Sequence, residues 1–246
     1  MEIKARSKTP KNHCKIVLWV ICLIIWVVAS IIASQLIIGY LMAFILGTDT
    51  LSQPVWTAVY SALSYLVALL LIIFIPPAII KKSQKSDRNL LGLKGLPTWS
   101  DIGLAPIGFI VYLLIASILT WLFSLFPWFD AEQVQNVGFS TYLSGAERVI
   151  AFFILVVIAP IMEEIIFRGW LYGKIRTKCP MIVSILIVSV VFGIVHFQWN
   201  VGVNVFALSI VLCGLREITG TIYSGIILHM LKNGLAFYLL YVLGIS

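Results

Sequence analysis

Apolar runs of about 20 residues or more recur along most of this 246-residue chain, and they restrict its fold more than any other feature. The residues are 61% hydrophobic and 11% charged, and the mean hydropathy is +1.06, which excludes an ordinary soluble domain. Because hydrocarbon cannot satisfy backbone hydrogen bonds, such runs predict an all-α, polytopic membrane helix bundle. We expect roughly seven to eight transmembrane helices, near residues 16–46, 55–80, 101–126, 148–173, 181–198, 202–216 and 221–243.

The net charge of +7 is distributed in a way that excludes a nucleic-acid partner. Lys and Arg gather before the first run, after the second and after the fourth, and the connections near 48–50, 130–132 and 198–200 carry none. This alternation follows the positive-inside rule, so the basic segments are expected to be cytoplasmic and to contact anionic membrane lipids. The sequence therefore predicts a basic cytoplasmic N-terminus at 1–15 and a cytoplasmic loop at 81–100.

Two adjacent glutamates, Glu163 and Glu164, interrupt the apolar run at 148–173. An ionisable side chain at membrane depth costs roughly 2.5–3.5 kcal/mol on insertion scales, so the pair indicates a buried partner, a proton or ion path, or an active site. Arg168 follows Glu164 by four residues on the same helical face and is expected to pair with it. Glu163 points about 100° away and lacks this partner. Pro160 is expected to kink the helix near the pair.

Two later runs carry further polar candidates. Phe192 and His196 lie four residues apart, as do His229 and Asn233, so each pair shares one helical face. His196 and His229 are, with His13, the only histidines of the chain. Two histidines and a carboxylate pair on three membrane helices indicate a site that carries out a chemical reaction.

The three motifs together, Glu-Glu-x-x-x-Arg, Phe-x-x-x-His and His-x-x-x-Asn, resemble the signature of the CPBP intramembrane proteases. That family includes type II CAAX prenyl endopeptidases and bacterial proteins linked to bacteriocin processing and self-immunity. The resemblance covers about residues 148–240 and implies a catalytic CPBP-like bundle at 148–243. The preceding segment, 16–126, then forms front transmembrane helices that match nothing specific.

The resemblance implies an endopeptidase, and peptide hydrolysis needs a base, a group that orients the base, and donors for the oxyanion. Glu163 is expected to be the base that activates water, and Glu164 with Arg168 the orienting pair. His196 would share the water, and His229 with Asn233 would donate to the oxyanion. The predicted catalytic residues are Glu163, Glu164, His196, His229 and Asn233, and Arg168 and Phe192 are expected to support the site.

A divalent metal, zinc first, is an expected cofactor with Glu163, His196 and His229 as ligands, since two histidines and one glutamate are an established catalytic zinc set. A glutamate and a histidine can also activate water without a metal. The sequence leaves both mechanisms open.

The expected substrate is a membrane-associated peptide or lipidated protein: a bacteriocin, pheromone or other precursor, or a prenylated CAAX-type C-terminus. The short chain shows no organelle-targeting extension, so we expect a bacterial plasma membrane and favour a peptide precursor. Oligomeric state and the side of the C-terminus are left open.

Two other functions are kept as alternatives. Intramembrane Glu and His also build proton relays, which makes a proton-coupled transporter the second hypothesis, although no pair of broken helices supports it. A non-catalytic immunity or scaffold protein is the third. Among the other charged residues, Lys232 is expected to face lipid, and Arg216 and Glu217 to form an ion pair at a cytoplasmic helix end.

Overall fold

The computed structural model describes residues 10–46, 51–80, 90–133, 138–140 and 143–244. Most of the expected basic N-terminus at 1–15 and the first part of the expected loop at 81–100 lie outside the described residues. The described part of the loop, from Leu90 to Thr98, packs against the ends of helices that contain the predicted motifs.

The described residues form helices and connections, as the apolar runs predict. Among the described residues, six helices are long and apolar enough to cross a membrane, and a shorter apolar helix accompanies them, which confirms the polytopic α-helical bundle. The helices are α1 (Pro10–Leu46), α2 (Gln53–Ile80), α4 (Trp99–Ser124), α8 (Met181–Ile194), α9 (Trp199–Thr219) and α10 (Tyr223–Phe237), which the π-helical η3 (Tyr238–Leu243) extends. One further rod comprises α5 (Gly145–Phe152), η1 (Phe153–Ile158), α6 (Ala159–Glu163), η2 (Glu164–Tyr172) and α7 (Gly173–Arg176).

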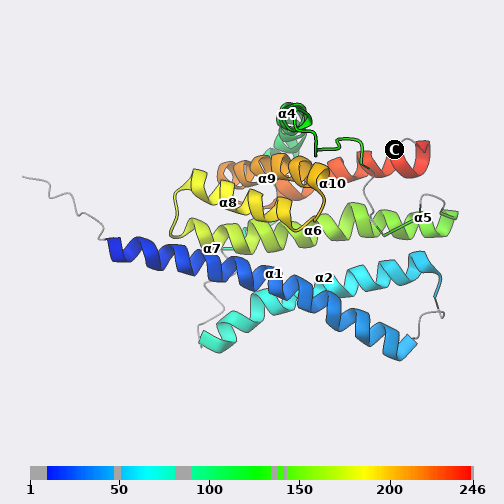
Figure 1. Cartoon of the computed structure of the whole chain (residues 1–246), viewed down its shortest axis with the longest axis horizontal. Coiled ribbons are helices and arrows are strands. Elements are labelled where there is room, and N and C mark those ends of the chain that lie inside the picture. The colour runs from blue at the N-terminus through cyan, green and yellow to red at the C-terminus, as the bar shows by residue number, and fades with distance from the viewer. Residues whose placement is uncertain (1–9, 47–50, 81–89, 134–137, 141–142, 245–246) are drawn as a thin grey trace, which may run out of the picture.

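The rod from α5 to α7 lies at the centre of the bundle (Figure 1). The antiparallel pair α1 and α2 packs on one side of it, and α8, α9 and α10 pack on the other. Helix α4 is seen nearly end-on in Figure 1 and covers α9 and α10 from outside. The two groups of helices therefore enclose the segment that carries both glutamates.

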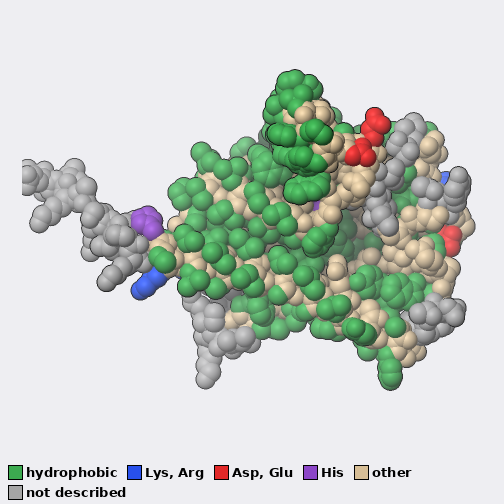
Figure 2. Space-filling model, in the orientation of Figure 1, with side chains coloured by type: hydrophobic (Ala, Val, Ile, Leu, Met, Phe, Trp, Pro, Cys, Tyr) green, Lys and Arg blue, Asp and Glu red, His purple; other side chains and the backbone are tan. Residues whose placement is uncertain are grey.

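The surface agrees with a membrane location. Large apolar side chains such as Leu18, Phe44, Ile110 and Trp121 are exposed along the outer helices. Figure 2 shows hydrophobic side chains over most of the visible face, with the visible basic groups near its two ends and the visible acidic groups at its upper right and right edges. Since a soluble protein rarely exposes so much contiguous apolar surface, lipid is the expected solvent of this face.

Helix α8 corrects the expected span at 181–198, because it ends at Ile194. Its 14 residues extend about 21 Å, less than the roughly 30 Å of a hydrocarbon core. The chain reverses at residues 195–198, and α8 and α9 approach closely where Gly193 faces Gly202. A Cβ at Gly193 would lie 2.9 Å from the Gly202 carbonyl oxygen, so the tight crossing requires the absent side chain.

Candidate functional site

The central rod departs from α-helical winding around Pro160. Proline has no backbone N–H, so the carbonyl group of Leu155, five residues earlier, loses the donor that the π-helical register of η1 would supply. The side-chain amide of Asn233, on α10, donates to this carbonyl oxygen at 2.8 Å. The expected change at Pro160 was a kink, whereas the structure shows π-helical winding on both sides of α6. Asn233 supplies a hydrogen bond that proline removes.

Glu163 ends α6, next to the start of η2, with 15% of its side chain exposed. The hydroxyl group of Tyr65, on α2, donates to its Oε1 atom at 2.6 Å. The Nε2 atom of His229 lies 3.8 Å from its Oε2 atom. Glu163 therefore has partners on both sides of the rod, whereas the sequence left it without one.

Glu164 is fully buried. Its Oε1 atom accepts from the Nη1 atom of Arg168 at 2.9 Å, which confirms the expected pair, and lies 3.0 Å from the Nδ1 atom of His229. Gly225 makes room for the carboxylate, because a Cβ there would lie 3.0 Å from Glu164 Oε2. The guanidinium of Arg168 stacks 4.2 Å from the centre of the Phe192 ring. Phe192 is therefore a support of the ion pair.

His196 lies in the turn after α8, outside any helix. Its Nδ1 atom is 2.7 Å from the carbonyl oxygen of Phe192. A carbonyl accepts only, so this bond places the proton on Nδ1 and leaves Nε2 as the acceptor nitrogen. The next residue, Phe197, has a φ of 54°, a left-handed conformation that costs a non-glycine residue about 1 kcal/mol or more. This strained turn fixes the direction of the imidazole.

A cavity of about 230 Å³ joins Glu163 and His196. Its opposite wall comes from α1 and α2, which contribute Ser34, Ser64 and Tyr65 among others. The hydroxyl groups of these residues make this wall of the cavity polar. The sequence contains a pattern that could have predicted this wall. Hydroxyl-bearing residues recur at helical spacing inside otherwise apolar runs, at Ser30, Ser34, Ser61, Ser64 and Tyr65.

Lys232 corrects another expectation. It is half-buried, and it interacts electrostatically with both Glu163 and His196 instead of serving only as a lipid-facing residue. A cation in the low-dielectric bundle acts over a longer range than in water. The glutamate thus lies in the field of Lys232 as well as near His229.

The structure brings most predicted site residues together. Glu163 and His196 line one cavity, and His229 lies between the two glutamates. Phe192 contacts both imidazoles, with ring centres 5.0 Å from His196 and 6.1 Å from His229. Asn233 is on the same face of α10 as His229, and its side-chain amide donates to the backbone carbonyl of Leu155 in the rod.

The expected metal ligands do not form a ready metal site. Among the described residues, no three His, Cys, Asp or Glu side chains are arranged to hold a metal ion. His196 directs Nδ1 at the Phe192 carbonyl, and His229 directs Nδ1 at Glu164, so each keeps a single nitrogen for another ligand. A metal bound by Glu163, His196 and His229 would require these side chains to move.

Helices with this apolar surface and an enclosed glutamate–histidine cavity define a multi-pass membrane protein with a polar site inside the bundle. Residues 145–235 match the family model of the type II CAAX prenyl endopeptidase Rce1-like proteins. This segment runs from the start of α5 into α10 and contains all three motifs. Over that segment the chain is similar to this family of membrane proteases, which supports the resemblance that the three motifs indicate. No curated protein and no solved structure matches the chain.

Proposed function

We propose that this protein is an intramembrane endopeptidase in which Glu163 activates water to hydrolyse a peptide bond of a membrane-associated substrate. The observation that carries the proposal is the shared cavity of Glu163 and His196, enclosed by membrane helices and walled by hydroxyl groups. Hydrolysis consumes water, which hydrocarbon does not supply, so a polar cavity at the base is a requirement of the reaction.

Glu163 is the proposed general base. Tyr65 holds its Oε1 atom, which leaves Oε2 for the proton of the attacking water. The free Nε2 atom of His196, fixed by the Phe192 carbonyl, accepts a second hydrogen bond from the same water. The carboxyl group formed at Glu163 then returns its proton to the leaving amine, which completes the hydrolysis.

Donors to the substrate carbonyl surround the base. The Nδ1 atom of His229 lies against Glu164, which also accepts from Arg168, so only the Nε2 atom of a doubly protonated ring is left to donate to the substrate carbonyl. Lys232, which interacts electrostatically with Glu163, would add positive potential near the developing oxyanion. Asn233 acts mainly as a positioning residue, because its amide holds the backbone at Leu155.

A divalent metal, zinc first, remains an alternative to this mechanism. Glu163, His196 and His229 would hold it after rearrangement, and it would supply Lewis-acid activation of water. In the present arrangement the Nδ1 atoms of both histidines are engaged by Phe192 and Glu164, so each histidine would offer only its Nε2 atom to the metal. Cleavage in the presence of a strong chelator, with and without added zinc, distinguishes the two mechanisms.

Basic residues gather at one end of the bundle and support the orientation of the protein in the membrane, with this end on the cytoplasmic side. Lys174, Arg176 and Lys178 lie there, and Lys178 stacks on Trp19 near the start of α1 at 4.0 Å. By the positive-inside rule this end, with the N-terminus, is cytoplasmic, and the other end of the helices, at Leu243, is external. The bacterial plasma membrane is the proposed location, and substrate would enter from the cytoplasmic side.

The substrate class is a membrane-associated peptide, either a bacteriocin or pheromone precursor or a prenylated CAAX-type C-terminus. To test the function, the purified full-length protein is reconstituted in proteoliposomes with a farnesylated CAAX peptide and with peptide precursors encoded near its gene. Cleavage in H₂¹⁸O that places ¹⁸O in the new carboxyl group supports direct attack by water.

The same preparation separates the alternative functions. Glu163→Gln should abolish cleavage. The matched control is Glu132→Gln, because Glu132 is exposed and does not line the cavity. Proton-coupled transport that depends on Glu163, without any cleavage, would favour a transporter. Binding of a peptide that both variants leave intact would favour an immunity or scaffold protein.

A further inference from the structure

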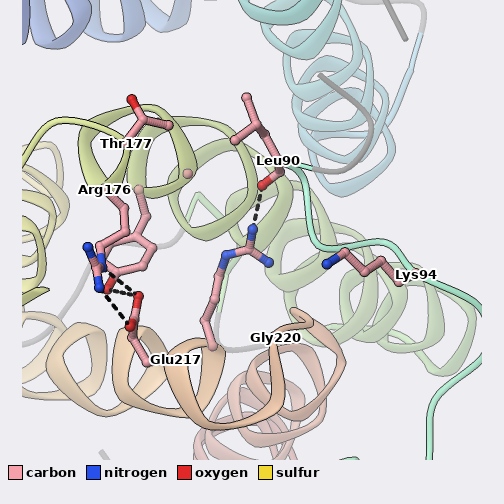
Figure 3. A pocket seen from close by; sticks show the side chains of 9 residues that line it. Leu90, Lys94, Arg176, Thr177, Glu217 and Gly220 are labelled. Carbon is pink, nitrogen blue, oxygen red and sulfur yellow. Dashed lines mark hydrogen bonds and ion pairs between the residues drawn. The ribbon is translucent and has the colours of Figure 1, made fainter. Parts of the chain in front are cut away.

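A second cavity, of about 310 Å³, lies away from the glutamates, where α7, the end of α9 and the segment before α4 meet (Figure 3). Its walls include Arg176 and Glu217, and these residues end or nearly end the candidate spans Gly145–Arg176 and Trp199–Thr219. Lys94 lies five residues before a third span, which begins at Trp99. Residues at the ends of three spans lie at the headgroup level of a bilayer.

The single carboxylate of this cavity is already neutralised. Glu217 accepts from the Nε atom of Arg176 at 3.0 Å and from the hydroxyl group of Tyr172 at 2.7 Å. The expected helix-end pair of Arg216 with Glu217 is thus replaced by a pair between two helices. Arg176 and Glu217 cancel, and the remaining formal charge of the cavity comes from Arg216 and Lys94.

Arg216 is held with its guanidinium against the segment before α4. Its Nη2 atom donates to the carbonyl oxygen of Leu90, and a Cβ at Gly92 would overlap the guanidinium. Its Nη1 atom is enclosed and has no hydrogen-bond partner among the described residues. An enclosed charged donor without a partner is costly, so an anion close to this guanidinium would be stabilising.

Lys94 enters the cavity from the opposite wall, as Figure 3 shows. Its neighbours place this wall against lipid, because Leu96 is 84% exposed and Trp99 is 87% exposed. Exposed leucine and tryptophan beside a lysine are typical of the boundary between headgroups and acyl chains. An anion bound between Lys94 and Arg216 would therefore lie in the layer of lipid phosphates.

We propose that this cavity binds the phosphate group of an anionic phospholipid, with Lys94 and Arg216 as its cationic partners. Basic pockets between transmembrane helices suit such headgroups, because each basic side chain near an anionic surface contributes about 1 kcal/mol. The site is separate from the proposed protease chemistry and its test does not depend on cleavage. Bound lipid would also hold the end of the rod that carries Glu163.

The test uses the full-length protein in nanodiscs with equal amounts of phosphatidylglycerol and phosphatidylcholine, followed by native mass spectrometry of the lipids retained on release. Wild type should retain phosphatidylglycerol in preference to phosphatidylcholine. Lys94→Gln should weaken this retention about five-fold, which corresponds to the loss of about 1 kcal/mol. Lys178→Gln is the matched control, because Lys178 is at the same end but outside the cavity.

Three outcomes would overturn the assignment. Equal retention of the two lipids would show that the cavity does not select an anion. An equal loss in Lys178→Gln would show a diffuse surface effect, and displacement of the lipid by millimolar inorganic phosphate would assign the cavity to a soluble anion. Unchanged thermal unfolding of Lys94→Gln in detergent confirms that the variant is folded.

Discussion

Replacement of Arg168 by methionine should destabilise the protein strongly, because it removes one partner of a buried ion pair at similar volume. Arg168 and Glu164 have no exposed side-chain surface, and the Nη1–Oε1 distance is 2.9 Å. Breaking such a pair costs roughly 3–5 kcal/mol. His229, 3.0 Å from the same oxygen, still faces Glu164, so we expect the lower end, about 3 kcal/mol.

Thermal unfolding of the detergent-solubilised protein, followed by tryptophan fluorescence, measures the effect. For a chain of this size, 1 kcal/mol corresponds to about 2–4 °C, so the midpoint should fall by about 6–12 °C. The double variant Glu164→Gln with Arg168→Met removes both charges and should recover most of this loss, since a buried pair replaced by neutral groups is often tolerated. A single variant as stable as wild type, or a double variant as unstable as the single, would refute the reasoning.

Two further predictions concern residues that touch the site from other helices. Tyr65→Phe should lower kcat roughly ten-fold or more with little change in KM, because a hydrogen bond to a charged group contributes about 1.5–3 kcal/mol. Tyr60 lines the same cavity and stacks on Trp56, so Tyr60→Phe is the control. Equal cleavage rates for the two variants would argue against the role of Tyr65. Asn233→Leu should lower the unfolding midpoint by several degrees, because the loss of a donor to a buried carbonyl costs about 1–3 kcal/mol; a midpoint equal to that of wild type would contradict the link to the rod backbone.

The sequence predicted the parts of the site that depend on helical periodicity. Glu164 and Arg168 pair because their spacing of four residues fixes their contact within one helix. His229 and Asn233 face the rod together for the same reason. The number of apolar runs likewise predicted the bundle, because membrane thickness fixes the length of a spanning helix.

The parts that the sequence missed depend on packing between distant segments. Tyr65 reaches Glu163 across 98 residues, and no local pattern reports which face of α2 meets the rod. The shortness of α8 was hidden because the apolar run continues through the turn that holds His196. Pro160 signalled a missing hydrogen bond, but only the packing of α10 revealed that Asn233 satisfies the free carbonyl at Leu155.

The front helices α1 and α2 line part of the cavity beside Glu163 but lie outside the segment that matches the family model. The matched segment, 145–235, contains the motif residues but not Tyr65 or the hydroxyl wall of α1 and α2. Substrate choice would therefore depend on helices outside the matched segment, since these helices form half of the cavity beside Glu163. The motif residues proposed for hydrolysis therefore lie in the matched segment, whereas α1 and α2, outside it, shape the access of substrate to Glu163.

The most direct test of the proposed mechanism is the initial cleavage rate of Glu163→Gln relative to wild type, in the same proteoliposomes and with the same cleaved substrate. Glutamine keeps the size of the side chain and one acceptor oxygen for Tyr65, but it cannot accept the proton of water. General-base catalysis contributes roughly 10²–10⁴-fold, so the rate should fall at least about 100-fold while the unfolding midpoint stays near that of wild type. A folded Glu163→Gln variant that cleaves within a few-fold of the wild-type rate would contradict the assignment of Glu163 as the base.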